Sequence, residues 1–155
     1  MNEKVLKRLV KIMKNGWDVE IATREEPDKN GNLRTVYYVC DFKAAFRIPK
    51  AEMWLDINKF NAKENNIVVK DMLEGKYTEI LRLKGCHSTN LKKVDLCLFS
   101  NCDESKTIAI DAGILSLFNM EHLEFAENTE MAMVINSKGE IAGFIKPTMM
   151  TKVGV

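Results

Sequence analysis

Short stretches that alternate apolar and polar residues recur along this chain, and turn residues end most of them. Alternation with a period of two is typical of strands with one buried face. The clearest stretches are 17–23, 35–40, 44–48, 107–110, 123–127, 130–136 and 141–146. Weaker alternation at 54–57, 77–84 and 94–100 predicts further strands, with loops at 59–66 and 85–93. The pattern predicts a chain built mainly on antiparallel sheet.

Two segments have the periodicity of helices. In residues 2–15 the apolar residues Val5, Leu9 and Ile12 recur at three- and four-residue spacing, and Asn15-Gly16 is a typical helix C-terminus. Asp111 has the side chain of an N-cap, and apolar residues recur from 114 to 118. We therefore expect helices at 2–15 and near 111–118.

The order of these elements is similar in two parts of the chain. Helix 2–15 precedes three predicted strands that end at Pro49, and the second helix precedes three that end at Pro147. Aligning the two prolines also aligns Phe46 with Phe144. This indicates an α+β fold of duplicated helix-plus-three-strand half-domains, with two helices packed on antiparallel sheet. The alternative is two amphipathic hairpins that are similar by chance. At 155 residues we expect a single domain over 1–155, with half-units near 2–49 and 107–147 and a variable middle at 50–106.

A duplicated unit of this kind resembles the domain of bacterial DNA sliding clamps of the polymerase III beta type. The likeness lies in Ile108–Leu115, where a strand leads into a helix, in the closing hairpin Met131–Pro147, and in Phe46–Pro49. The resemblance implies a clamp-like fold that is not catalytic, with helices that present basic residues to the DNA backbone. The second helix carries Asp111 and has no basic face, so only the first is expected to do so.

Charge is unevenly distributed, although 23 basic and 22 acidic side chains give a net charge of only +1. That balance excludes a uniformly basic nucleic-acid binder. Residues 1–15 nevertheless have a net charge of +4, and residues 103–130 have −6. The basic stripe on the first helix is the predicted nucleic-acid-binding site, which consists of Lys4, Lys7, Arg8, Lys11 and Lys14. The same stripe is also typical of a solvated amphipathic helix, and that alternative stays open.

No pattern in the sequence indicates an enzyme, a metal site or a cofactor. Cys86, His87, Cys97 and Cys102 lack the paired spacing of zinc ligands. His87-Ser88-Thr89 is similar to half of a paired histidine phosphoesterase motif, but Leu123 follows the other histidine, His122. No glycine-rich phosphate loop is present. We therefore predict a binding module without catalytic residues, and a small hydrolase or phosphoesterase is the least favoured alternative.

The expected partner is the DNA backbone or a replication or defence protein, in a bacterium, phage or mobile element. The rival hypothesis is an inhibitor or adaptor that binds another protein and has no role on DNA. Its candidate surfaces are the aromatic patch and the apolar tail, which consist of Met53, Trp54, Phe60 and Tyr77, and of Met149, Met150, Val153 and Val155. The residues of the aromatic patch are also typical of a core, which is the favoured interpretation, and the tail either packs against the fold or docks elsewhere. The opposed charged segments also suggest a homo-oligomer. No stretch resembles a membrane span or a signal peptide, so we expect a cytoplasmic protein with reduced cysteines.

Overall fold

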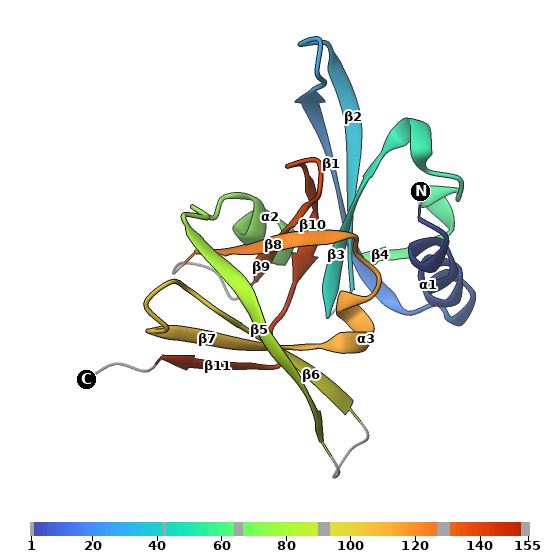
Figure 1. Ribbon diagram of the computed structural model, residues 1–155. Coiled ribbons are helices and arrows are strands. Elements are labelled where there is room, and N and C mark those ends of the chain that lie inside the picture. Colours follow the sequence, from blue (N-terminus) through green and yellow to red (C-terminus); the bar gives the residue numbers. More distant parts are fainter. Residues whose placement is uncertain (1, 42, 64–66, 90–93, 127–130, 153–155) are drawn as a thin grey trace. The chain divides into compact units, whose positions relative to one another are not determined.

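The computed structural model describes residues 2–41, 43–63, 67–89, 94–126 and 131–152. The chain forms two compact units, Met1–Leu73 and Glu74–Val155. Its class is α+β, as the sequence predicts (Figure 1). The predicted middle segment 50–106 contributes to both units, and each unit is described by itself below.

Unit 1 contains two helices, two short 3-10 turns and four strands in its described residues. They are α1 (Glu3–Asn15), β1 (Asp18–Pro27), β2 (Leu33–Cys40), β3 (Ala44–Pro49), η1 (Lys50–Glu52), η2 (Ile57–Lys59), β4 (Asn61–Lys63) and α2 (Ile67–Leu73). The strand order is β3-β2-β1-β4. Neighbours are antiparallel except β4, which runs parallel to β1.

The first helix confirms its prediction in detail. The Asn2 side chain caps it by accepting a hydrogen bond of 2.8 Å from the Lys4 backbone N–H. Gly16 follows the last turn with φ of 61°, the left-handed conformation that glycine adopts most easily. Val5, Leu9 and Ile12 are buried, so the apolar stripe of the sequence is the packed face of α1. The core of unit 1 continues through β2 and β3, in which nearly every residue from 36 to 48 that is described and apolar is buried.

Unit 2 consists of antiparallel strands with one short helix in its described part. Its elements are β5 (Glu79–Thr89), β6 (Val94–Ser100), β7 (Lys106–Asp111), α3 (Ala112–Leu115), β8 (Met120–Phe125), β9 (Ala132–Asn136), β10 (Ile141–Ile145) and β11 (Met149–Lys152). The strand order is β11-β7-β6-β5-β8-β9-β10. The core consists of fully buried side chains from most of these strands, among them Leu81, Phe99, Ile108, Ile110, Leu123 and Phe144.

The long strand β5 connects the two halves of this arrangement (Figure 1). Glu79–Leu81 pair with β8, whereas residues 82–89 pair with β6. A β-bulge between Leu83 and Gly85 accompanies the change of partner. Beyond Leu81, the only strand paired with β5 in the described part of the chain is therefore β6.

The predicted duplication is not confirmed. The first helix has 13 residues, but α3 has only four and ends at Leu115, well short of the predicted 118. Helix α3 has the N-cap that the sequence predicts, because Asp111 Oδ1 accepts hydrogen bonds from the backbone N–H groups of Gly113 and Ile114. The helix nevertheless ends after one turn, with Ser116 as its C-cap. A further helix, α2, was not predicted, and β4 departs from a purely antiparallel sheet.

Several local predictions are also wrong. The predicted strand at 54–57 is irregular chain over 54–56 followed by the start of η2 at Ile57, and the predicted loop at 59–66 contains β4. Strand β5 continues to Thr89 through the segment predicted to be a loop, because pairing with β6 supports it. Strand β1 likewise extends to Pro27, beyond the predicted end at residue 23, and Asp28–Asn32 form the turn that follows. The predicted strand at 130–136 is confirmed as β9 from Ala132 to Asn136, and Glu130 lies outside the described residues.

Candidate nucleic-acid interface

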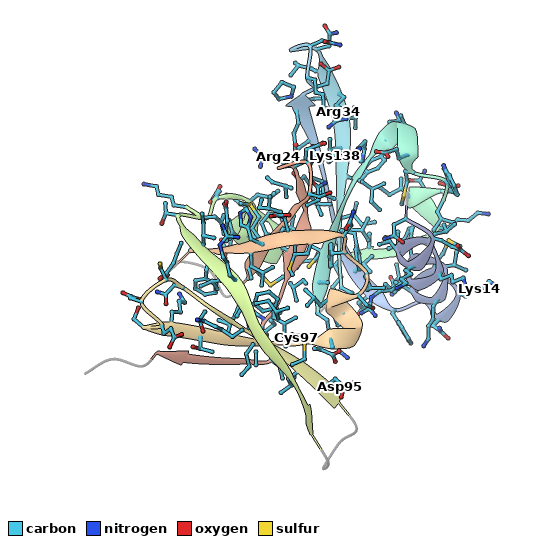
Figure 2. All side chains as sticks on the ribbon, in the orientation of Figure 1. Lys14, Arg24, Arg34, Asp95, Cys97 and Lys138 are labelled. Carbon is cyan, nitrogen blue, oxygen red and sulfur yellow. The ribbon has the colours of Figure 1, made fainter. Side chains whose placement is uncertain are left out.

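The lysine side chains of α1 form its solvent-facing side. Lys4, Lys7, Lys11 and Lys14 are all exposed, and their spacing of three, four and three residues places them on one face of the helix. Figure 2 labels Lys14 near the end of this face. We call these four residues the lysine face.

Little negative charge offsets the lysine face. The Lys7 ammonium lies 3.4 Å from the Glu3 carboxylate, but both side chains are about four-fifths exposed, so water screens the pair strongly. Within the described part of the chain, Lys4, Lys11 and Lys14 have no carboxylate at ion-pair distance. Three of the four cations are therefore available to an external anion.

Arg8, the fifth predicted binding residue, has a different environment. Its Nη2 and Nε lie 2.6 and 3.0 Å from Asp41 Oδ2. Asp41 is 11% exposed and also accepts hydrogen bonds from the backbone N–H groups of Lys43 and Ala44. Arg8 thus links α1 to the connection between β2 and β3, and it is less free than the lysines to contact a ligand.

An exposed aromatic ring lies at the end of the lysine face. Trp17 follows the C-cap glycine and is 49% exposed. The Lys11 ammonium lies 5.7 Å from the centroid of its ring, within the range of a cation–π contact. Alternation in the sequence predicts Trp17 in a half-buried strand, whereas the structure places it before β1 and exposed. Its place directly after the helix stop, next to the lysine stripe, is the signal that could have revealed it.

Unit 1 also holds a partly buried polar cluster that consists of Glu26, Tyr38 and Arg47. Arg47 Nε and Nη2 donate to Glu26 Oε1 at 3.2 and 2.9 Å, and the Tyr38 hydroxyl donates to Glu26 Oε2. Burial acts to raise the pKa of Glu26, but the hydrogen bonds from Tyr38 and Arg47 and the Arg47 charge outweigh it, so this pKa is lowered. Burial, with the neighbouring carboxylate, raises the pKa of Tyr38 to about 12. The cluster therefore cross-links β1, β2 and β3 at neutral pH.

Most described carboxylates of the acidic segment 103–130 serve structural roles in unit 2. Glu104 pairs with Lys84, Asp111 caps α3, and Glu124 Oε1 lies 3.2 Å from His122 Nε2. Lys106, the cation of this segment, is buried, with its ammonium 3.3 Å from the Phe125 ring centroid and 3.8 Å from Glu79 Oε2. Glu127 and Glu130 lie outside the described residues.

The candidate chemical groups do not come together as a metal or catalytic site among the described residues. No group of three or more histidine, cysteine or carboxylate side chains is arranged to hold a metal ion there. Cys86 and Cys97 are neighbours, whereas nothing places Cys102 with them. The side chains of His87, Ser88 and Thr89 lie outside the described ones.

The aromatic patch and the apolar tail, the two predicted docking surfaces, have different environments in the structure. Phe60 is buried and the Tyr77 ring packs 5.6 Å from that of Phe144, so of the aromatic patch only Trp54, at 68%, is strongly exposed. Residues 149–152 of the apolar tail form β11 against β7, while Val153 and Val155 lie outside the described residues. No helix in the described chain is long and apolar enough to cross a membrane.

Comparisons with known proteins return no relative. No family model, curated protein or solved structure matches this chain.

Proposed function

We propose that unit 1 is a non-catalytic module that binds the nucleic-acid backbone through the lysine face of α1. The observation that supports this most is the set of four exposed lysines on one helix face, three of them without a described carboxylate partner. Trp17 supplies an exposed ring at the end of that face, where a base can stack. The charge and the aromatic ring together favour a nucleic acid over a general anion.

The dimensions of the lysine face suit a phosphate backbone. Lys4 and Lys14 are ten residues apart, which gives a face about 15 Å long at the rise of an α-helix. One strand of a duplex places a phosphate roughly every 3.4 Å along its axis, so about four phosphates fall within this length. Each lysine can then neutralise one phosphate. Such contacts position a protein on nucleic acid but carry no sequence information.

The resemblance to a sliding-clamp domain belongs to this proposal. Backbone binding through the lysine face is consistent with a cytoplasmic protein that binds phage, mobile-element or bacterial DNA. It is consistent with a monomer and with a homo-oligomer. The clamp resemblance contributes only the expected partner, since binding through α1 requires no ring.

The test is the salt dependence of DNA binding, measured by fluorescence anisotropy of labelled single-stranded and duplex oligonucleotides. Neutralising four phosphates predicts a log–log slope of about −2.8 for single strands and −3.6 for duplex. The affinity should then fall about 50- to 150-fold between 50 and 200 mM salt. A W54F variant leaves Trp17 as the single tryptophan, and its fluorescence should be quenched when a base stacks on it.

Charge-reversal variants assign the binding to α1. K7E/K11E reverses the charge of two residues of the lysine face and should abolish DNA binding. K50E/K59E makes the same change of net charge at two exposed lysines of η1 and η2, and it should leave binding nearly unchanged. Equal affinities for the two double variants, or a slope near zero for the unmodified chain, would refute the proposal.

A protein partner is the second candidate, because unit 1 also exposes large apolar side chains. Trp54 is 68% and Leu33 69% exposed, and aromatic side chains are enriched at protein interfaces. A chain that shows no DNA affinity at low salt but loses a protein partner on W54A substitution would support this reading instead.

A further inference from the structure

Two cysteines of unit 2 face each other across adjacent antiparallel strands. Cys86 of β5 is paired in register with Cys97 of β6. Directly opposed residues of such strands have Cα atoms about 4.5 or 5.5 Å apart, and a disulfide spans about 4.4–6.8 Å. The two Sγ atoms lie 2.7 Å apart. Backbone and side chains therefore already have a geometry from which a sulfur–sulfur bond can form.

The two thiols differ in their access to solvent. Cys86 is exposed, whereas Cys97 is only 4% exposed. Cys97 and Asp95 lie on the same strand (Figure 2). Burial, the neighbouring Cys86, and the charges of Asp95 and Asp111 raise the pKa of Cys97 to about 11. An oxidant from solvent therefore reaches Cys86 first, and Cys97 remains a protonated thiol beside it.

The surrounding strand pairing leaves this position accessible. Residues 82–89 of β5 have β6 as their only strand neighbour in the described structure, so the outer edge of β5 is open beside Cys86. The bulge between Leu83 and Gly85 lies next to the pair and gives the local backbone an irregular register. A small reagent can thus approach Cys86 without displacing another strand.

We propose that Cys86 and Cys97 form a reversible oxidation site that closes into a disulfide when the protein meets a peroxide. In the first step the Cys86 sulfur attacks the peroxide O–O bond, which gives a sulfenic acid and releases water or an alcohol. In the second, Cys97 sulfur displaces hydroxide from that sulfenic acid, and the Cys97 proton leaves with it as a second water. The two thiols lose two electrons and two protons, and the peroxide gains them. A dithiol reductant reverses the change by thiol–disulfide exchange.

The other two cysteines supply contrast. Cys40 is buried in unit 1, its pKa is raised to about 12 mainly by burial, and its thiol contacts the Asp41 carbonyl. Cys102 is exposed in the turn after β6, and no other cysteine is opposite it in the described chain. Exposure alone therefore predicts oxidation of Cys86 and Cys102 alike, whereas geometry predicts a disulfide only between Cys86 and Cys97.

The test is thiol mapping of the full chain after treatment with hydrogen peroxide. The reduced protein is oxidised, its remaining thiols are alkylated, and the unfolded chain is digested with trypsin and chymotrypsin without reductant. Cleavage after Phe99 separates Cys97 from Cys102. Mass spectrometry should find one cross-linked pair that contains Cys86 and Cys97, with Cys40 still alkylated, and a dithiol should restore both thiols.

Variants separate the steps. C102S is the matched control and should form the same cross-link as the unmodified chain. C97S should stop at the Cys86 sulfenic acid, which dimedone traps, and C86S should give no cross-link. If Cys86 and Cys97 both stay alkylatable at a peroxide dose that oxidises Cys102, the proposal is wrong. It is equally wrong if the cross-link joins different molecules, or if the chain unfolded in urea forms the same pair as readily.

Discussion

Replacing Arg47 with methionine tests whether the Glu26–Tyr38–Arg47 cluster holds the strands of unit 1 together. The variant keeps the length and apolar stem of the side chain but removes both charged hydrogen bonds to Glu26 Oε1. Arg47 is 10% and Glu26 22% exposed, so water can replace the lost partner only in part. Breaking a fully buried ion pair costs about 3–5 kcal/mol, and the Tyr38 hydrogen bond remains. We therefore expect R47M to lower the free energy of unfolding by about 2–3 kcal/mol.

The pH dependence of this loss follows from the lowered pKa of Glu26. A carboxyl group whose pKa is lower in the folded state stabilises the fold above its unfolded-state pKa. That contribution disappears as the pH falls through the folded-state value. The difference in the free energy of unfolding between the unmodified chain and R47M should therefore be largest at pH 7. It should become smaller as the pH falls below the usual pKa range of glutamate.

Urea unfolding followed by tryptophan fluorescence is a suitable assay, because both tryptophans, Trp17 and Trp54, lie in unit 1. E26Q is the companion variant, since it keeps an acceptor for Tyr38 but removes the charge. Its loss should be smaller than that of R47M, and the double variant should lose less than the sum of the two. A loss below about 0.5 kcal/mol for R47M, or one that grows as the pH falls, would show that the cluster does not stabilise unit 1 as argued.

Two further predictions concern single positions. G16A should destabilise α1 by about 1 kcal/mol, because alanine resists the φ of 61° although its Cβ would meet no atom within 4 Å. G16N should lose less stability than G16A. Thermal unfolding followed by circular dichroism compares the variants, and equal stability of G16A and the unmodified chain would contradict the prediction. K106M should cost no more than about 1–2 kcal/mol, because methionine fills the same space against Phe125 and Glu79 keeps its hydrogen bond from Asn101. K106E should cost more, since it places a second carboxylate beside Glu79, and a denaturant series in which K106E matches K106M would contradict this account.

The local elements of this protein were largely predictable. Helix α1 could be located because one stripe of apolar residues and an Asn-Gly stop agree within fifteen residues. The hairpins β2–β3 and β9–β10 were also expected, because alternation and turn residues lie side by side in the chain. The lysine face was predictable once the helix was located, because its lysines recur at helical spacing on a face other than the buried apolar stripe.

Other features depended on contacts between distant residues. Local alternation ends β5 near Lys84, yet pairing with β6 carries the strand through to Thr89. The parallel pairing of β4 with β1 joins residues more than forty positions apart and leaves no local signal. Arg8 was predicted as a free cation of the basic stripe, but Asp41, thirty-three positions away, engages it.

The sequence by itself therefore determined where helix α1 begins and ends, which of its faces is charged, and that the rest is mainly strand. These properties depend on side-chain chemistry and on periodicity over a few residues. Only the tertiary structure decided strand register, which brings Cys86 opposite Cys97 and Glu26 within reach of Arg47. Register is set by the packing of whole strands, because a slip of one residue would exchange the buried and exposed faces along the entire pairing.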